Sequence, residues 1–318
     1  MKKLSIVVPC FNEKECIKLL WESVEQVFQK VDSFIYEIIY VDDGSKDGTL
    51  QEIKSLAKTI GDQKIKYISF SRNFGKEAAM YAGLLRADGD YVVLMDADLQ
   101  HPPELLPKML KVLEDGNYDC CGARRVNRKG EPKIRSFFSK SFYKLIGGIS
   151  SVNLIQNGSD FRMMTSKVAK SLVSLKERER FTKGIFSWVG FSTYWIDYEN
   201  VERAAGTTKW SAASLLHYAI NGILAFATAP LRGVVYLGLV ITLISFVYAV
   251  YVFYCAIQYP GERTGYSTIV LLLLFFGGVI IFLLGVLGEY LARIYLEVKQ
   301  RPIYIEKESN MPGDEYEE

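Results

Sequence analysis

Two long stretches without a charged residue lie near the carboxyl end of the chain, and they constrain its fold more than any other feature. The first runs from 233 to 261 and the second from 264 to 288. A helix of about 20 apolar residues crosses a bilayer core of about 30 Å, so each stretch is long enough to span a membrane. The alternative is a pair of buried core helices in a soluble protein. The sequence predicts two membrane-spanning helices, at about 233–257 and 268–290.

The flanking charges predict how this pair of helices is oriented. Only a few residues, with one Arg and one Glu, connect the two stretches, so the helices form a hairpin. Basic residues concentrate on the cytoplasmic side of membrane proteins, and here they flank the outer ends of the hairpin. We therefore expect a multi-pass protein of the plasma (inner) membrane, with the preceding domain and both termini in the cytoplasm. The flanking basic residues are Arg232, Arg293, Lys299 and Arg301.

Short runs rich in β-branched and aromatic residues alternate with helical patterns through the first 122 residues. Such alternation is typical of an α/β domain with a mostly parallel, Rossmann-like sheet covered by helices on both faces. Ligands bind such sheets beyond the carboxyl ends of the strands. The expected strands are 4–9, 36–42, 65–70, 91–96 and 118–122, and the expected helices are 14–30, 47–60, 76–87 and 103–115.

Polar residues follow each of the first four expected strands. One such cluster could be ordinary turn and cap chemistry, because Asp, Gly and Ser favour turns. Four clusters at one edge of a sheet predict a nucleotide site instead. The clusters are Pro9, Asn12 and Glu13; Asp42, Asp43, Gly44 and Ser45; Ser71, Arg72, Asn73, Gly75 and Lys76; and Asp96, Asp98 and Gln100.

The charge distribution favours small anionic partners. The chain has a formal net charge of +2, but the tail from Glu306 onward carries −5, which leaves +7 on the remainder. Nucleotide diphosphates, lipid phosphates and anionic headgroups fit this bias. The sequence has neither a long Lys/Arg tract nor a paired stacking motif, so we do not expect a nucleic-acid partner.

Five motifs occur in a fixed order: VVPCFNE, VDDGSKDGT, SRNFGKE, MDADLQHPPE and GSDFRMM. This ordered set resembles the inverting family 2 glycosyltransferases, which have the GT-A fold. The likeness is greatest to enzymes that glycosylate a polyprenyl phosphate, namely the bacterial undecaprenyl (bactoprenol) phosphate glucosyltransferases and the dolichol-phosphate mannose synthases. It covers essentially the whole chain, including the two C-terminal spans. Each motif alone is weak, whereas their order is specific.

The resemblance implies a hexosyltransferase reaction at the cytoplasmic membrane face. A single sugar, glucose from UDP-glucose in the first instance, would pass to undecaprenyl phosphate for later cell-envelope glycosylation. Inversion at the anomeric carbon would give a β-linked lipid from an α-linked donor. The alternatives are GDP-mannose or a UDP-N-acetylhexosamine as donor, a processive polysaccharide synthase, and a nucleotide-sensing membrane protein that is not an enzyme.

The resemblance also implies a metal site at Asp96, Asp98 and Gln100. Oxygen ligands of this type suit Mg²⁺ or Mn²⁺, and the metal would neutralise charge on the departing nucleotide diphosphate. The alternative is a solvated turn with Asp caps. Donor contacts are implied for Pro9, Asn12, Glu13, Asp42, Asp43, Arg72, Lys76, Asp96 and Ala97.

Several of these residues have a second interpretation. An acidic residue at 42 or 43 can accept hydrogen bonds from a base or a ribose. Glu13 could instead be a helix-start carboxylate that the helix dipole favours, and Arg72 and Lys76 could cap the third helix. Asp160 matches the proposed catalytic base of the family. The acceptor phosphate has a second pKa of about 6, so Asp160 could instead orient the acceptor or the sugar.

Two further segments point to the acceptor and the bilayer. The segment 203–210 resembles the phosphate-gripping loop of the family; the alternative is a basic surface loop. Residues 132–149 have apolar side chains on one helical face and lysines on another, which is typical of a helix in the headgroup layer; an ordinary surface helix is the alternative. The predicted acceptor contacts are Arg203, Lys209, Trp210 and Arg135.

The expected organisation is a catalytic domain of residues 1–210, an interfacial helix of 211–231, the hairpin of 232–292 and a tail of 293–318. The uncharged segment 211–231 is expected to be interfacial, because His217, Asn221 and Pro230 disfavour a full span. Residues 301–306 alternate like an edge strand, which predicts pairing with a neighbouring subunit in a homo-oligomer.

Overall fold

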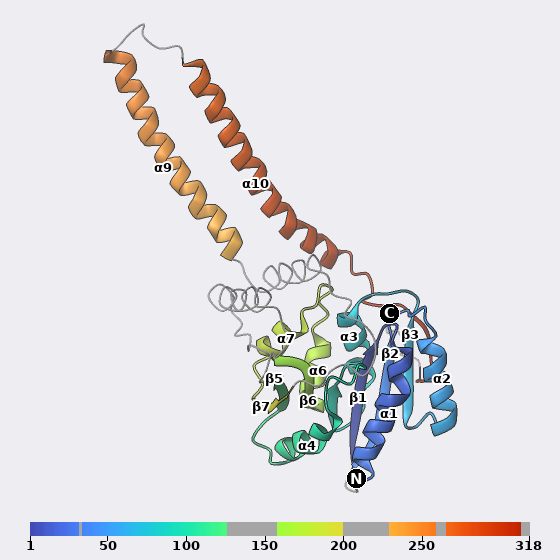
Figure 1. The fold of residues 1–318 in the computed structure, drawn as a ribbon. Coiled ribbons are helices and arrows are strands. Elements are labelled where there is room, and N and C mark those ends of the chain that lie inside the picture. Colours follow the sequence, from blue (N-terminus) through green and yellow to red (C-terminus); the bar gives the residue numbers. More distant parts are fainter. Residues whose placement is uncertain (32–33, 126–157, 200–228, 259–264, 313–318) are drawn as a thin grey trace.

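Eight strands form one sheet in the computed structural model, which describes residues 1–31, 34–125, 158–199, 229–258 and 265–312 (Figure 1). Their order across the sheet is β7-β5-β6-β4-β1-β2-β3-β8. The strands are β1 (Lys2–Cys10), β2 (Phe34–Asp42), β3 (Ile65–Phe70), β4 (Tyr91–Leu94), β5 (Cys120–Arg125), β6 (Gly158–Thr165), β7 (Thr193–Tyr198) and β8 (Glu306–Ser309).

Helices cover both faces of this sheet. One apolar core lies under α1, α2 and α4, and a second lies under α3, α6 and α7. Strand β1 is buried on both faces, because alternate residues of its apolar run enter the two cores. The helices are α1 (Lys14–Phe28), α2 (Thr49–Ile60), α3 (Lys76–Arg86), the 3-10 helix η1 (Pro103–Leu105), α4 (Leu106–Glu114), α6 (Ser166–Ser174), α7 (Thr182–Trp188), α9 (Ala229–Gln258) and α10 (Tyr266–Val298).

The strand order reverses beside β1, which creates a site for ligands. Strands β1, β2 and β3 pair in parallel on one side, while β4 pairs in parallel with the other side of β1. Ligands bind such sheets at the point of reversal, beyond the carboxyl ends of the strands. Beyond β4 the sheet becomes mixed, because β6 is antiparallel to both β4 and β5. The predicted fold class, an α/β domain with a mostly parallel sheet followed by an apolar hairpin, is confirmed.

Close packing fixes α3 over the sheet. A Cβ atom at Gly83 would lie 2.2 Å from Cγ1 of Val7, so only glycine allows α3 to approach β1 this closely. Because α3 begins at Lys76, this packing also sets where that lysine enters the site.

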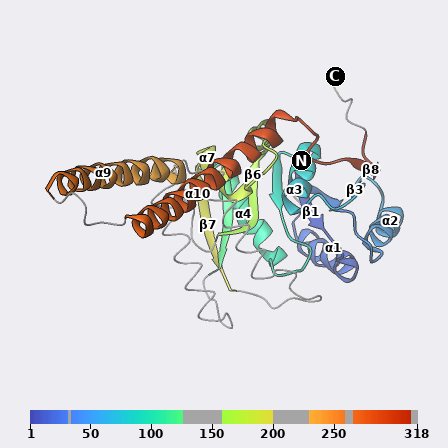
Figure 2. The same cartoon turned by 90° about the horizontal axis from the view of Figure 1, so that it is seen from above.

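The helices α9 and α10 extend away from one end of the soluble domain (Figures 1 and 2). Their spans Gly233–Cys255 and Leu272–Val298 have mean hydropathies of 2.3 and 2.4, and neither is buried within the protein. The core helices of a soluble protein are mostly buried, so the alternative of two such helices does not hold. Helix α10 continues past the expected end at 290, and its last turns contact the soluble domain.

The C-terminal tail returns to the sheet of its own chain. Strand β8 pairs antiparallel with β3, and the Ser71 N–H donates to the Ile305 carbonyl at 3.0 Å. Tyr304 stacks on Phe70 with ring centroids 4.8 Å apart. The prediction for 301–306 is therefore wrong in two respects. The strand begins at Glu306, and it pairs with β3 of the same chain, because the tail leaves α10 within reach of that open edge. A homo-oligomer as such stays a prediction.

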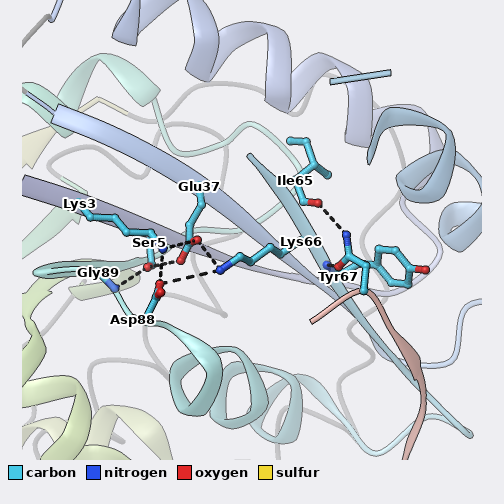
Figure 3. A network of polar contacts seen from close by, with 9 residues as sticks. Lys3, Ser5, Glu37, Ile65, Lys66, Tyr67, Asp88 and Gly89 are labelled. Atoms are coloured by element: carbon cyan, nitrogen blue, oxygen red, sulfur yellow. Dashed lines mark hydrogen bonds and ion pairs between the residues drawn. The ribbon is translucent and has the colours of Figure 1, made fainter. Parts of the chain in front are cut away.

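A buried charge network lies near the amino ends of β1, β2 and β3 (Figure 3). Glu37 is fully buried, and its Oε1 accepts a hydrogen bond from the Ser5 hydroxyl at 2.6 Å. The ammonium groups of Lys3 and Lys66 each lie 2.7 Å from Glu37 Oε2. Asp88, in the turn before β4, makes an ion pair with Lys3. These contacts fasten the amino ends of three strands to the turn after α3.

Candidate active site

The loops after β1 and β2 are tied together at the carboxyl edge of the sheet. Asn12 has a φ of 53°, its N–H donates to Ser45 Oγ at 2.9 Å, and its side-chain oxygen accepts the Lys46 N–H at 2.8 Å. The Glu13 N–H donates to Thr49 Oγ1 at 2.9 Å. Two of the predicted donor contacts, Asn12 and Glu13, therefore belong to a linked pair of loops, beside the half-buried Pro9 of β1.

The loop after β2 also approaches the loop after β3. Gly44 has a φ of 68°, and a Cβ atom there would lie 2.5 Å from the carbonyl carbon of Arg72. Only glycine combines this left-handed backbone with so close an approach. The Arg72 guanidinium lies 4.0 Å from the centre of the Phe74 ring and donates to the Asn73 carbonyl at 3.0 Å. Arg72 is exposed, at the rim of the site.

Asp42 and Asp43 are almost fully buried, at 1% and 3% exposed. Asp42 accepts hydrogen bonds from the Ser45 N–H at 3.2 Å and the Ser69 hydroxyl at 2.9 Å. The two carboxylate oxygens of Asp43 accept the N–H groups of Phe74 and Gly75 at 2.6 and 2.9 Å. Burial raises the pKa of Asp43 to about 6, although these hydrogen bonds oppose the rise. Both carboxylates hold loops in place, and their contact with a nucleotide stays a prediction.

This geometry predicts that Asp43→Asn lowers the free energy of unfolding by about 1–2 kcal/mol, because the new amide N–H₂ must face a backbone N–H. Asp42→Asn is the matched control. Its loss should be smaller, because the Ser69 hydroxyl can turn to donate or accept. Thermal unfolding of the full chain in detergent measures both. Equal losses for the two variants would contradict the anchoring role of Asp43.

Lys76 joins the two halves of the site. Its ammonium nitrogen lies 2.6 Å from Asp96 Oδ1 and 2.9 Å from Asp160 Oδ2. Burial opposes the charged form, but Asp160 and Asp96 raise the pKa of Lys76 well above its ordinary value. The lysine therefore stays protonated and holds two carboxylates that would otherwise repel each other.

Asp160 reaches Asp96 through strand pairing. Leu94 of β4 lies opposite Arg162 of the antiparallel β6, so residue 160 falls beside the turn that follows β4. A second ammonium group, that of Lys183 on α7, lies 3.8 Å from Asp160 Oδ1. Burial alone would raise the pKa of Asp160, but Lys76 and Lys183 lower it far below its ordinary value. Asp160 is therefore an ionised carboxylate held between two cations.

The turn after β4 carries the remaining acidic residue. Asp98 is 9% exposed, and its Oδ1 accepts the Gln100 N–H at 3.1 Å. The neighbouring Ala97 is buried. The Asp96 N–H donates to Nδ1 of His101 at 3.4 Å, and the buried imidazole stacks on Phe161. Burial lowers the pKa of His101, so the neutral ring supports this turn as a hydrogen-bond acceptor.

The side chains of this turn fit a hard divalent cation. Asp96, Asp98 and Gln100 supply oxygen ligands within five residues of sequence. In the part of the chain that the structure describes, no three His, Cys, Asp or Glu side chains cluster as a metal cage. Such a cage is not required, because Mg²⁺ is commonly bound by one or two carboxylates together with substrate phosphates.

Glu77 supports the site from the next position along α3. Its Oε2 accepts the Thr182 N–H at 3.0 Å and also contacts the Thr182 hydroxyl. Burial raises the pKa of Glu77 to about 7, although the hydrogen bonds from Thr182 oppose the rise. This contact fixes the start of α7, and Lys183 follows directly.

The structure brings Lys76, Asp96 and Asp160 into contact and places Asp98 and Gln100 on the same turn as Asp96. The predicted acceptor contacts Arg135, Arg203, Lys209 and Trp210 lie outside the described residues, as do the segments 132–149 and 211–228. Sequence reasoning missed Glu77, His101 and Lys183. The first two adjoin chosen residues within motifs, whereas no motif marks Lys183.

Known proteins resemble this chain along nearly its whole length. The sequence profile of glycosyl transferase family 2 matches residues 5–172, and that of the GtrB C-terminal hairpin matches residues 229–294. The glycosyltransferase CsbB of Bacillus subtilis is 44% identical over 99% of this chain and 94% of its own length. A glycosyltransferase of Synechocystis is 40% identical over 99% of this chain and 97% of its own length. The SfII prophage-derived bactoprenol glucosyl transferase of Shigella flexneri is 40% identical over 97% of this chain and 98% of its own length.

Proposed function

Because this chain belongs to glycosyltransferase family 2, we propose that it transfers glucose from UDP-glucose to undecaprenyl phosphate at the cytoplasmic face of the membrane. The observation that carries the proposal is the nearly full-length likeness to bactoprenol glucosyl transferases, hairpin included. The chain is thus a glycosyltransferase of the GT-A fold. The glucose, the donor nucleotide and the lipid acceptor are the proposed parts.

The direction of the sheet supports a lipid acceptor. The N-terminus lies at the end of the soluble domain opposite the spans, so β1 runs toward α9 and α10 (Figure 1). The carboxyl ends of the parallel strands, with Asp96 and Lys76, therefore face the side on which a membrane would lie. A lipid phosphate at the bilayer surface can reach a donor there without leaving the membrane.

The folded tail supports the proposed orientation. Strand β8 follows the second span and belongs to the same sheet as β1. Two membrane crossings by α9 and α10 would leave the tail and the soluble domain on the same side, which agrees with this pairing. The basic residues that flank the hairpin favour the cytoplasm for that side.

The chemistry needs little help from a base. The acceptor phosphate has a second pKa of about 6 and is largely ionised at pH 7. One of its oxygens bonds to the anomeric carbon of the sugar, while the bond to the donor diphosphate breaks and the electron pair leaves with the nucleotide. This displacement inverts the anomeric carbon and gives a β-linked product. Asp160, ionised between two lysines, is a weak proton acceptor, so we infer that it orients the reactants.

We propose that Asp98 and Gln100, with Asp96, hold Mg²⁺ or Mn²⁺ when the donor binds. The metal would neutralise charge on the leaving diphosphate. Lys76 stands beside the same carboxylates and can offer its ammonium group to donor phosphate oxygens.

A donor panel tests the proposal. Full-length protein in mild detergent is incubated with undecaprenyl phosphate, Mg²⁺ or Mn²⁺, and labelled UDP-glucose, UDP-N-acetylhexosamines or GDP-mannose. We expect one glucose per lipid, β-linked by NMR, from UDP-glucose. Transfer from another donor alone would overturn the choice of glucose. Several sugars on one lipid would indicate a processive synthase. Nucleotide binding without transfer would indicate a sensor.

A further inference from the structure

Lys183 is a cation of the site that no sequence motif marks. It lies in the first turn of α7, and its ammonium nitrogen is 3.3 Å from the Gly158 carbonyl oxygen and 3.8 Å from Asp160 Oδ1. Its side chain is 31% exposed. Lys183 therefore makes only a long ion pair with Asp160, and part of its side chain is open to solvent.

The two lysines at Asp160 differ in how firmly they are held. Lys76 makes contacts of 2.6 and 2.9 Å with two carboxylates, so its charge is already matched. The distance from Lys183 to Asp160 exceeds that of a hydrogen bond. A lysine carries three N–H donors on a flexible stem. Lys183 can therefore turn toward an incoming anion at a small electrostatic cost, whereas Asp96 and Asp160 already occupy two of the three donors of Lys76.

The position of α7 indicates which anion this is. The predicted donor contacts lie on the loops after β1, β2, β3 and β4, up to the start of α3, whereas α7 comes after β6 and α6 and packs in one core with α6 and α3. The segment just before α7 contacts the second span. Glu179 makes an ion pair with Arg293 at 2.7 Å, and the Arg178 N–H donates to Glu297 Oε1 at 2.8 Å. Lys183 thus lies four residues from a direct contact with α10.

Glu77 keeps Lys183 in this place. By accepting the Thr182 N–H, it ties the start of α7 to the start of α3, which carries Lys76. The starts of α3 and α7, which carry the two lysines, are therefore joined. Both helices lie on the side of the domain from which α10 leaves (Figure 1).

We propose that Lys183 donates a hydrogen bond to the phosphate of the lipid acceptor, an inference that rests on the proposed function. A phosphate monoester confined to the membrane surface approaches from the side of α10. There Lys183 offers a charge-assisted hydrogen bond, which is among the stronger contacts a phosphate can make. Asp160, at the boundary between the two lysines, then lies between the acceptor and the donor.

The test compares Lys183→Met and Lys183→Arg with wild type and with Lys170→Met, an exposed lysine on α6 as matched control. Initial rates are measured in detergent while undecaprenyl phosphate and the donor are varied separately. Lys183→Met should raise KM for the acceptor roughly 10–100-fold, the effect of one charged hydrogen bond, and leave KM for the donor unchanged. Lys183→Arg should restore most of the acceptor affinity, and Lys170→Met should behave as wild type.

The other outcomes overturn the proposal in distinguishable ways. A rise in KM for the donor alone would place Lys183 at the donor. A fall in kcat with both KM values unchanged would mean that Lys183 only positions Asp160. Nucleotide binding and thermal unfolding show whether each variant is folded. Wild-type protein that glycosylates no polyprenyl phosphate would end the proposed function itself, whereas active wild type with unchanged Lys183→Met would end only this inference.

Discussion

Replacing Asp98 by Ala is expected to lower kcat/KM for sugar transfer by roughly 10²–10³-fold, the cost of removing one group that stabilises charge in the transition state. Asp98 follows β4 at the carboxyl edge of the sheet, where the proposed metal would meet the donor diphosphate. Initial rates with UDP-glucose and undecaprenyl phosphate measure the loss. Binding of free UDP without metal should change little, because the base and ribose contacts are predicted on other loops.

The matched variant Asp98→Asn separates two roles of this side chain. Asn keeps an oxygen that can accept the Gln100 N–H, which Asp98 now accepts at 3.1 Å, but it lacks the charge. If the charge matters, Asp98→Asn loses nearly as much activity as Asp98→Ala. Asp115→Ala, at an exposed residue after α4, is the control. Full activity of Asp98→Asn would refute a role for the Asp98 charge in catalysis.

The parallel part of the fold could be predicted because its signal is local. Strand β3 was expected at 65–70 and has those bounds, since a short run rich in β-branched and aromatic residues is typical of a strand. The spans were predictable for a similar reason, because about 20 uncharged residues leave few alternatives. Strand ends were less certain, and β5 begins two residues after the expected start at 118.

The strands added late in the chain, at both edges of the sheet, could not be predicted in this way. Strands β6, β7 and β8 join through long-range pairing, and β8 pairs with a strand more than 230 residues earlier. The contact between Asp160 and Lys76 depends on the antiparallel pairing of β6 with β4. Lys183 reaches the same carboxylate only because α7 packs beside β6. The spacing of residues along the chain does not indicate which distant strands pair.

Asp43 shows why the roles of correctly chosen residues can still differ from expectation. The motif predicts a carboxylate at the strand end, and the structure has one there. Both of its oxygens, however, accept backbone N–H groups of the loop before α3. The short side chain of Asp accepts hydrogen bonds strongly, and this property suits both ligand contacts and the anchoring of turns. Sequence alone therefore cannot separate the two roles.

Replacing Glu37 by Ala is expected to lower the free energy of unfolding by about 3–5 kcal/mol, the typical cost of breaking a buried ion pair. Glu37 is fully buried, and its carboxylate lies 2.7 Å from the ammonium groups of both Lys3 and Lys66 (Figure 3). Its loss removes the buried anion between two like charges and leaves them only the exposed Asp88 as a partner. It also removes the acceptor of the Ser5 hydroxyl. Thermal or urea unfolding of the full chain in detergent measures the change.

The control is Glu22→Ala, whose partner Lys18 is an exposed neighbour on α1 at 3.8 Å; such pairs contribute about 0–1 kcal/mol. If desolvated charge is the cause, replacing Glu37 by Leu together with Lys3 and Lys66 by Met should recover much of the stability lost in Glu37→Ala. A triple variant less stable than Glu37→Ala would contradict this account. The network lies at the amino ends of the strands, whereas Asp96 and Asp98 follow the carboxyl end of β4. The folded fraction of each variant should therefore keep the wild-type kcat/KM, which separates what holds the sheet together from what transfers the sugar.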